Sequence, residues 1–199
     1  MRRLKAIAIT SELIGADETK YIRMILDCGW SRVHLRHPMA TTDDIRRLIE
    51  SLPTDYHKRL WLHDHHELSK EYSLGGLQLN SRQPLPPTGY NGALSQTCHS
   101  IAEVKSPRSK AFVSVTLSPV FDSVSKQGYC AAFSPGELMT LSAADHVIAL
   151  GGITPETLPQ LERYEFEGFA VLGYLFSASS STDLNERLIK LQPYICYNS

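Results

Sequence analysis

The sequence predicts an α/β fold: a single (β/α)8 TIM barrel with some short or missing helices. Three observations lead to this fold class. Apolar runs typical of buried strands alternate with amphipathic helical segments along the chain. Eight such runs are present, and eight βα units favour a closed barrel over an open doubly wound sheet. The downstream ends of these runs carry polar residues or glycines, as expected where ligands bind to such barrels.

The first half of the chain alternates strand and helix as far as residue 80. The apolar run 4–10 predicts a strand, and residues 21–28 predict a helix that Gly29 ends. Thr41 begins a capping box, which opens a helix that Pro53 ends. The remaining elements of this half are strands at 32–36, 59–63 and 76–80 and a short helical turn at 67–72.

The second half continues the alternation after the proline-rich loop 84–87. Ser100 begins another capping box, and Ser134 precedes a proline at the first position of a helix. Because about 200 residues is the lower limit for such a barrel, helices near 65–75 and 81–91 should be short or missing. The other elements expected are strands at 93–97, 111–116, 146–150 and 168–175 and helices that begin at Thr154 and Asp183.

Length and charge restrict the class of protein. A chain of 199 residues can bury a sizeable core, and residues 1–199 contain no linker, so a single domain is expected. The formal net charge is −1, with acids and bases interspersed. This pattern argues against nucleic acid and membrane surfaces as partners and favours small molecules. No apolar run approaches the length of a transmembrane span. The oligomeric state stays open.

Cysteine usage and the start of the chain indicate a cytoplasmic protein. The first apolar run is too short for a signal peptide, and Lys5 interrupts it. The cysteines show no CxxC pair and no zinc-ligand spacing, which fits reduced thiols. They are Cys28, Cys98, Cys130 and Cys196.

The segment 118–126 follows a predicted strand and is the clearest candidate for a phosphate-binding loop. Ser123 and Ser125 supply short hydroxyl donors, and Lys126 supplies a movable positive charge suited to an oligophosphate. Taken alone, the segment is explained more simply as a solvated serine-rich loop. Its position in a barrel favours the phosphate interpretation, because loops at the carboxyl ends of strands collect on one rim.

Other polar residues are expected at the same rim. Arg36 offers a planar fork suited to phosphate, although an exposed arginine would look the same in the sequence. Asp64 is either a magnesium ligand or the N-cap of the next helix. The histidines around it lack a further ligand at a diagnostic spacing, which argues against zinc. His99 precedes a capped helix and is either a proton carrier or a structural residue.

Two glycine sites lie at the ends of the last two predicted strands. Gly151 and Gly152 follow the seventh strand, and Gly173 follows the apolar part of the eighth. Exposed backbone N–H groups next to a helix start form a common phosphate site in such barrels. Ordinary turn glycines are the alternative, but their occurrence on adjacent strands favours phosphate.

With these residues the chain resembles the thiamine phosphate synthase and thiazole tautomerase superfamily over nearly its whole length. The best match is the segment 118–126, which corresponds to the family's Gly-Pro-Val-Phe-x-Thr-x-Thr-Lys with serines in place of both threonines. The segment 34–38, His-Leu-Arg-His-Pro, corresponds to Gln-Leu-Arg-x-Lys and keeps only Arg36. His63 and Asp64 correspond to an Asn-Asp pair whose aspartate binds magnesium.

The remaining signature positions are partly altered. Gln83 stands at the second magnesium-binding aspartate of a Gly-Gln-x-Asp run. The segment 95–99 corresponds to Gly-x-Ser-x-His and keeps a hydroxyl and the histidine. Gly152 corresponds to a glycine of a Gly-Gly-Ile run, and the segment 172–173 corresponds to a final Val-Ser. Pro119 stands where the tautomerases place their catalytic histidine, which favours the synthase.

The resemblance implies an enzyme that joins a hydroxymethylpyrimidine pyrophosphate to a thiazole phosphate and releases pyrophosphate. It implies Mg²⁺ as the cofactor, bound weakly here because the Gln83 amide brings no charge. Two alternatives stay open: an isomerase of the tautomerase kind, in which His99 or another rim histidine moves the proton, and a non-catalytic barrel that binds thiamine-pathway phosphates. The residues implied are Arg36, Lys126 and His99 for catalysis; His34, Arg36, His63, Thr97, Ser123, Ser125, Lys126, Gly152, Leu172 and Gly173 for substrate binding; and Asp64 and Gln83 for the metal.

Overall fold

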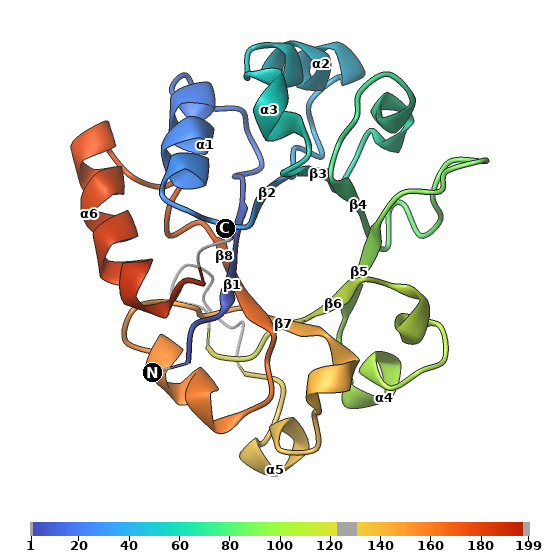
Figure 1. Ribbon diagram of the computed structural model, residues 1–199, viewed down its shortest axis with the longest axis vertical. Coiled ribbons are helices and arrows are strands. Elements are labelled where there is room, and N and C mark those ends of the chain that lie inside the picture. Colours follow the sequence, from blue (N-terminus) through green and yellow to red (C-terminus); the bar gives the residue numbers. More distant parts are fainter. Residues whose placement is uncertain (1, 123–130, 197–199) are drawn as a thin grey trace.

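A computed structural model of the protein describes residues 2–122 and 131–196, and its strands close into a barrel. All strands are parallel and pair in sequence order, and β8 pairs back onto β1. Figure 1 shows this ring of strands with the helices outside it. The predicted (β/α)8 barrel is therefore confirmed. The strands are β1 Lys5–Ile9, β2 Arg32–Leu35, β3 Leu60–Leu62, β4 Gly76–Leu79, β5 Leu94–Cys98, β6 Ser114–Leu117, β7 Val147–Leu150 and β8 Gly168–Leu172.

The helices that cover the barrel are unequal in length. Three of them span nine residues or more, and each of these covers the barrel with an apolar stripe. Several of the others are single turns or 3₁₀ helices. The helices are α1 Glu18–Asp27, α2 Thr42–Glu50, α3 Thr54–His57, α4 Ile101–Val104, α5 Pro135–Leu138 and α6 Ser181–Leu191, with 3₁₀ helices η1 His66–Lys70, η2 Ser109–Ala111, η3 Ala143–Asp145, η4 Leu158–Arg163 and η5 Gln192–Tyr194.

The capping signals predict most helix starts correctly. Thr41 and Asp44 form the expected reciprocal capping box at α2, and Ser134 and Glu137 form another at α5. Ser100 caps α4 by accepting from the backbone N–H of Glu103. The Glu103 carboxylate, however, accepts from the N–H of His99 at 2.7 Å instead of completing the box at Ser100.

Three expected elements differ from the structure. The helix expected to begin at Thr154 is replaced by a turn and then η4, because Pro159 has no backbone N–H to donate to the Pro155 carbonyl, as an α-helix there would require. β6 begins at Ser114 rather than at residue 111, because residues 109–111 form η2. β8 ends at Leu172, before Gly173, whose φ is 85°. The expected short helices are confirmed: residues 66–70 form only η1, and no helix lies between β4 and β5 in the described chain.

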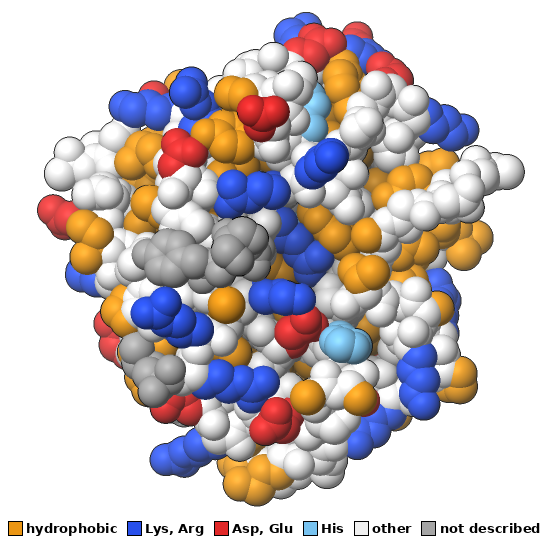
Figure 2. Space-filling model, in the orientation of Figure 1, with side chains coloured by type: hydrophobic (Ala, Val, Ile, Leu, Met, Phe, Trp, Pro, Cys, Tyr) orange, Lys and Arg blue, Asp and Glu red, His pale blue; other side chains and the backbone are white. Residues whose placement is uncertain are grey.

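The apolar core lies between the barrel and its helices. Trp30 and Phe169 are fully buried there, and their rings meet edge to face with centroids 5.8 Å apart. The Leu4 and Ile195 backbones pair, which brings the two ends of the described chain together. Charged side chains of both signs are interspersed with hydrophobic ones on the face shown in Figure 2. Among the described residues no helix combines the length and apolar character needed to cross a membrane.

The interior of the barrel has an apolar side and a polar side. Ile7, Ile9, Ile148 and Ala170, from β1, β7 and β8, form a separate buried apolar cluster. The opposite side carries buried and half-buried polar side chains from β2 to β6. One of them, Arg32 on β2, donates to Ser114 Oγ on β6 at 2.8 Å, and this bond crosses the interior because β2 and β6 are not neighbours. The polar group comprises the half-buried Arg32 and the buried His34, Gln78, Ser95, Ser114 and Thr116.

The packing of Trp30 can be tested by truncation. Because the ring is fully buried against Phe169, we expect Trp30→Ala to reduce the free energy of unfolding by about 3–5 kcal/mol. Leu13→Ala, at a side chain that is 73% exposed, should change it by about 0.5 kcal/mol or less. Urea unfolding measures both, and a similar small loss in the two variants would show that Trp30 does not pack as described.

Candidate active site

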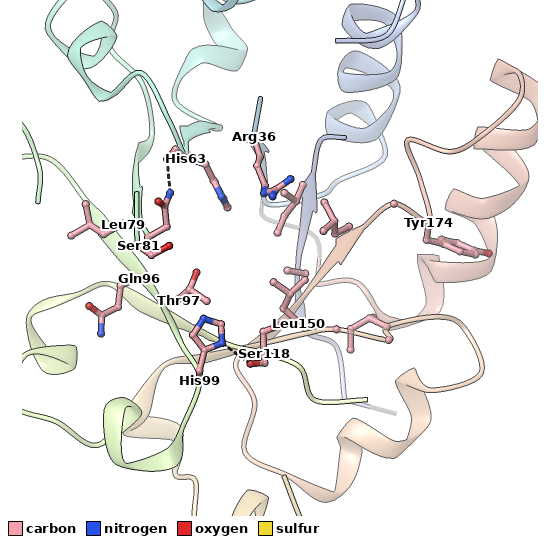
Figure 3. Close-up of a pocket in the computed structure, with 18 of the residues that line it drawn as sticks. Arg36, His63, Leu79, Ser81, Gln96, Thr97, His99, Ser118, Leu150 and Tyr174 are labelled. Atoms are coloured by element: carbon pink, nitrogen blue, oxygen red, sulfur yellow. Dashed lines mark hydrogen bonds between the residues drawn. The ribbon is translucent and has the colours of Figure 1, made fainter. Parts of the chain in front are cut away.

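A cavity of about 1110 Å³ opens at the carboxyl ends of the strands. Residues at or just beyond the end of every strand line it, as the rim predicted from the sequence requires. Figure 3 shows Arg36 and His63 pointing into this cavity from β2 and β3, with Thr97, His99 and Ser118 across from them. Its walls continue the two sides of the barrel interior: Ile9, Leu150, Ala170 and Leu172 form an apolar wall, and the side chains after β2 to β6 are mostly polar.

His63 and His34 form a buried pair, of which only His63 lines the cavity. Nδ1 of His34 lies 2.8 Å from Nε2 of His63. His34 is 1% exposed, and its ring stacks on Trp61 with centroids 5.5 Å apart. His34 was expected to bind substrate. Its position behind His63 means that it would act by orienting the His63 ring.

Arg32 lies below this pair, and its positive charge adds to the effect of burial on the two histidines. Its guanidinium lies 4.0 Å from the centre of the Trp61 ring. Burial lowers the pKa of Arg32 to about 10. Burial, and then the positive charge of Arg32, hold the pKa of His34 well below its usual range. Burial, followed by the charges of Arg36 and Arg82, lowers the pKa of His63 to about 3.

Arg36 is fixed at the rim by its neighbours. Both of its terminal nitrogens donate to Glu12 Oε1 at 3.1 Å, and its backbone N–H donates to Thr10 Oγ1 at 2.8 Å. The Thr10 hydroxyl also lies 3.1 Å from His37 Nε2. The arginine fork therefore faces the cavity from a backbone that side-chain bonds hold in place.

Thr97 and His99 present defined hydrogen-bonding groups to the cavity. Gln78 Nε2 donates to Thr97 Oγ1 at 3.1 Å, so the threonine hydroxyl hydrogen remains for a ligand. Nδ1 of His99 lies 3.0 Å from the Ser118 carbonyl oxygen (Figure 3). Since a carbonyl only accepts, Nδ1 carries the hydrogen, and Nε2 of the neutral ring is left as an acceptor.

The two glycine sites meet at the rim after β7 and β8. Gly152 has a φ of 63°, and a Cβ there would lie 2.3 Å from the Asp122 carbonyl oxygen, so only glycine fits. Gly173 has a φ of 85° with open space around its Cα. Among the described residues, no group accepts a hydrogen bond from the backbone N–H of Gly152 or of Gly173. Both groups can therefore serve an anion. Ser123, Ser125 and Lys126 lie outside the described residues, and their predicted roles stay predictions.

Comparison with known proteins places this arrangement in a family. The sequence matches the family of thiamine monophosphate synthase over residues 6–175. The chain belongs to the thiamine monophosphate synthase family. Among solved structures, a thiamine phosphate pyrophosphorylase from Bacteroides thetaiotaomicron is 29% identical, with a TM-score of 0.85, covering 96% of this chain and 97% of that chain. One from Pyrococcus furiosus is 17% identical, with a TM-score of 0.76, covering 96% and 95%, and shows the shared fold.

Membership of the thiamine monophosphate synthase family implies magnesium, but the donor set at the expected site does not fit a protein-held cation. Nε and Nη2 of Arg82 donate to Asp64 Oδ1 at 3.0 and 2.8 Å, and Nη2 also donates to Oδ2 at 3.2 Å. Gln83 lies in a turn closed by Asn80 and is not part of the cavity wall. No group of three or more His, Cys, Asp or Glu side chains suited to a metal occurs among the described residues.

Three residues of the site, Glu12, Arg32 and Arg82, were not predicted from the sequence. Glu12 and Arg82 pair with Arg36 and Asp64 through contacts that join separate loops. Arg32 gives one local signal, a charge at the first position of a strand whose other residues are buried. A half-buried arginine in that position needs a partner inside the barrel, which is Ser114.

The neutral histidine pair makes stability depend on pH. Unfolded His34 takes up a proton below about pH 6.5, whereas the folded residue resists it, so stability falls as the pH drops from 7 to 5. We expect His34→Phe, which retains a ring against Trp61, to reduce this slope by up to about 1.4 kcal/mol per pH unit. Urea unfolding at pH 5, 6 and 7 measures the slope.

An exposed residue without a titratable group provides the control. Leu13→Ala should keep the parental dependence on pH, because this side chain is 73% exposed and carries no charge. An unchanged slope in His34→Phe would show that His34 is not buried in the neutral form.

Proposed function

We propose that the protein is a thiamine phosphate synthase. In this proposal it joins hydroxymethylpyrimidine pyrophosphate to thiazole phosphate and releases pyrophosphate. The observation that carries the proposal is the rim itself: a single cavity in a member of this family combines an apolar wall with two separate sets of anion donors. One set is the backbone N–H groups of Gly152 and Gly173, and the other is the guanidinium groups after β2 and β4.

The apolar wall suits the two aromatic rings of such substrates. Ile9, Leu150, Ala170 and Leu172 offer flat hydrophobic contact without competing hydrogen bonds. Across the cavity, His63 turns its ring toward the ligand, and its Nε2 is already engaged by His34. In our proposal Nδ1 of His63 and the hydroxyl of Thr97 hydrogen-bond the polar edge of the pyrimidine.

The reaction needs charge stabilisation more than a protein nucleophile. The C–O bond between the pyrimidine methylene and pyrophosphate breaks, and the pyrophosphate leaves with the electron pair. The lone pair of the thiazole nitrogen then forms the new C–N bond. Arg36, together with Lys126, would stabilise the leaving anion, and the closed barrel floor would exclude water from the methylene cation.

The thiazole phosphate would bind at the glycine site. In our proposal the N–H groups of Gly152 and Gly173 donate to its oxygens, helped by the Ser123 and Ser125 hydroxyls, while Leu172 contacts the thiazole ring. Magnesium in this proposal enters with the pyrophosphate of the substrate, because Asp64, the carboxylate at the expected metal site, is already paired with Arg82.

One observation favours an isomerase as the second candidate. Nε2 of His99 is left as an acceptor by the bond from Nδ1 to Ser118, and His99 lines the cavity. A thiazole tautomerase would use such a nitrogen to move a proton. A barrel that only binds thiamine-pathway phosphates is the third possibility.

Incubation with the two synthase substrates distinguishes these candidates. The proposal expects thiamine phosphate and pyrophosphate to accumulate in equal amounts, measured by chromatography with and without Mg²⁺. Conversion between thiazole tautomers without thiamine phosphate would support the isomerase, and binding without any turnover would support the binding-only barrel.

Lys126 should matter for turnover more than for stability. Removing one preorganised charge contact to a leaving group costs about 10²–10³ in rate, so we expect Lys126→Ala to form thiamine phosphate about a hundredfold more slowly. Its melting temperature should stay near that of the parent, as should that of Lys20→Ala on the exposed face of α1. Parental turnover by Lys126→Ala at saturating substrate would argue against a role of this loop in the synthase reaction.

Gly173 can be compared with a glycine of the same conformation outside the cavity. Gly173 and Gly89 have φ values of 85° and 80°, and neither has an atom within 4 Å of an added Cβ. Substitution by valine should therefore destabilise both by a similar amount, about 1–2 kcal/mol. Only Gly173→Val should weaken thiazole phosphate binding, by about tenfold or more, in calorimetric titrations. Equal affinity in the two folded variants would remove Gly173 from the phosphate site.

A further inference from the structure

Asp64 is paired with the guanidinium of Arg82 and does not form an open cation site. Its side chain is 9% exposed, and both of its oxygens accept from Arg82. In this bidentate pair a planar fork matches a carboxylate, which is among the stronger arrangements of charged side chains. A divalent cation at Asp64 would have to displace Arg82 or share the carboxylate with it.

Arg82 is positioned at both its backbone and its side chain. Its backbone N–H donates to Asn80 Oδ1 at 2.8 Å, and Nδ2 of the same Asn80 donates to the His63 carbonyl oxygen at 2.6 Å. The side chain is then fixed by Asp64. Arg82 is therefore preorganised relative to His63, a residue that points into the cavity (Figure 3).

The guanidinium of Arg82 keeps donors for a ligand. Its side chain is 45% exposed and lines the same cavity as Arg36. Asp64 accepts from Nε and Nη2, whereas Nη1 donates to no group within the part of the chain that is described. A salt bridge that only stabilised the fold would not require the Nη1 edge of the Arg82 guanidinium to face the cavity.

We propose that Arg82, held in place by Asp64, binds the pyrophosphate group of the ligand in the position that a protein-held divalent cation would otherwise occupy. Asp64 is then a positioning residue for Arg82 and not a metal ligand. The identity of the anion rests on the proposed synthase function. The replacement of a metal site by an arginine rests only on the contacts of Asp64 and Arg82.

Titration with inorganic pyrophosphate tests this assignment without turnover. Isothermal calorimetry of the parent protein should show binding in EDTA, with an affinity within about threefold of that in excess Mg²⁺. Arg82→Gln should weaken binding in EDTA by about tenfold or more, because it removes a charged hydrogen-bond donor. It also frees the Asp64 carboxylate, so added Mg²⁺ should restore part of the affinity.

The surface pair of Arg46 and Glu71 supplies a matched control. Nε and Nη2 of Arg46 donate to Glu71 at 3.1 and 3.0 Å, the same two nitrogens that Arg82 uses, but this pair lies away from the cavity. Arg46→Gln removes the same charge and should leave pyrophosphate affinity unchanged. Circular dichroism confirms that each variant is folded.

A direct metal titration provides the second measurement. Mn²⁺ binding followed by electron paramagnetic resonance should be equally weak in the parent and in Asp64→Asn. Pyrophosphate binding by the parent only when Mg²⁺ is present, parental affinity of Arg82→Gln in EDTA, or loss of Mn²⁺ binding in Asp64→Asn would each overturn the proposal. If thiamine phosphate is still formed in that case, the synthase function stands and only the role of Arg82 is wrong.

Discussion

Closure of the parallel sheet is the constraint on which the site depends. Because β8 pairs with β1 in parallel register, the carboxyl ends of all strands meet at one rim, and the residues that follow them surround one cavity. Residues as distant in sequence as Arg36 and Gly173 thus face the same space. The helices contribute little to this arrangement, and the barrel tolerates single-turn helices such as α5 because each strand is held by two neighbours.

The interior of the barrel determines which part of the rim can bind which chemical group. The aliphatic cluster that includes Ile7 and Ile148 continues upward into an apolar wall. On the other side, the cation of Arg32 lies under two neutral histidines, and the polar wall begins at His63. This division suits a ligand with aromatic rings on one side and ionised or hydrogen-bonding groups on the other.

The fold was predictable because its signals are local. Buried parallel strands appear in the sequence as apolar runs. Thr41 and Ser134 mark helix starts because their side chains bond to groups within the same turn. The position of most site residues at the rim followed from the same alternation. The pairing of Asp64 with Arg82 and of Arg32 with Ser114 was not predictable, because each pair joins separate strands or loops. The expected helix at Thr154 failed for a local reason: Pro159 has no backbone N–H to donate to the Pro155 carbonyl, so an α-helix cannot continue there.

In the proposed synthase, one rim holds the two anions at separate places around a shared apolar wall. A crystal structure with thiamine phosphate and pyrophosphate bound tests it most directly. The account predicts the ester phosphate at the N–H groups of Gly152 and Gly173, the rings against Leu150 and Leu172, and pyrophosphate between Arg36 and Arg82. Both anions at one place, or the rings against the polar wall, would contradict it.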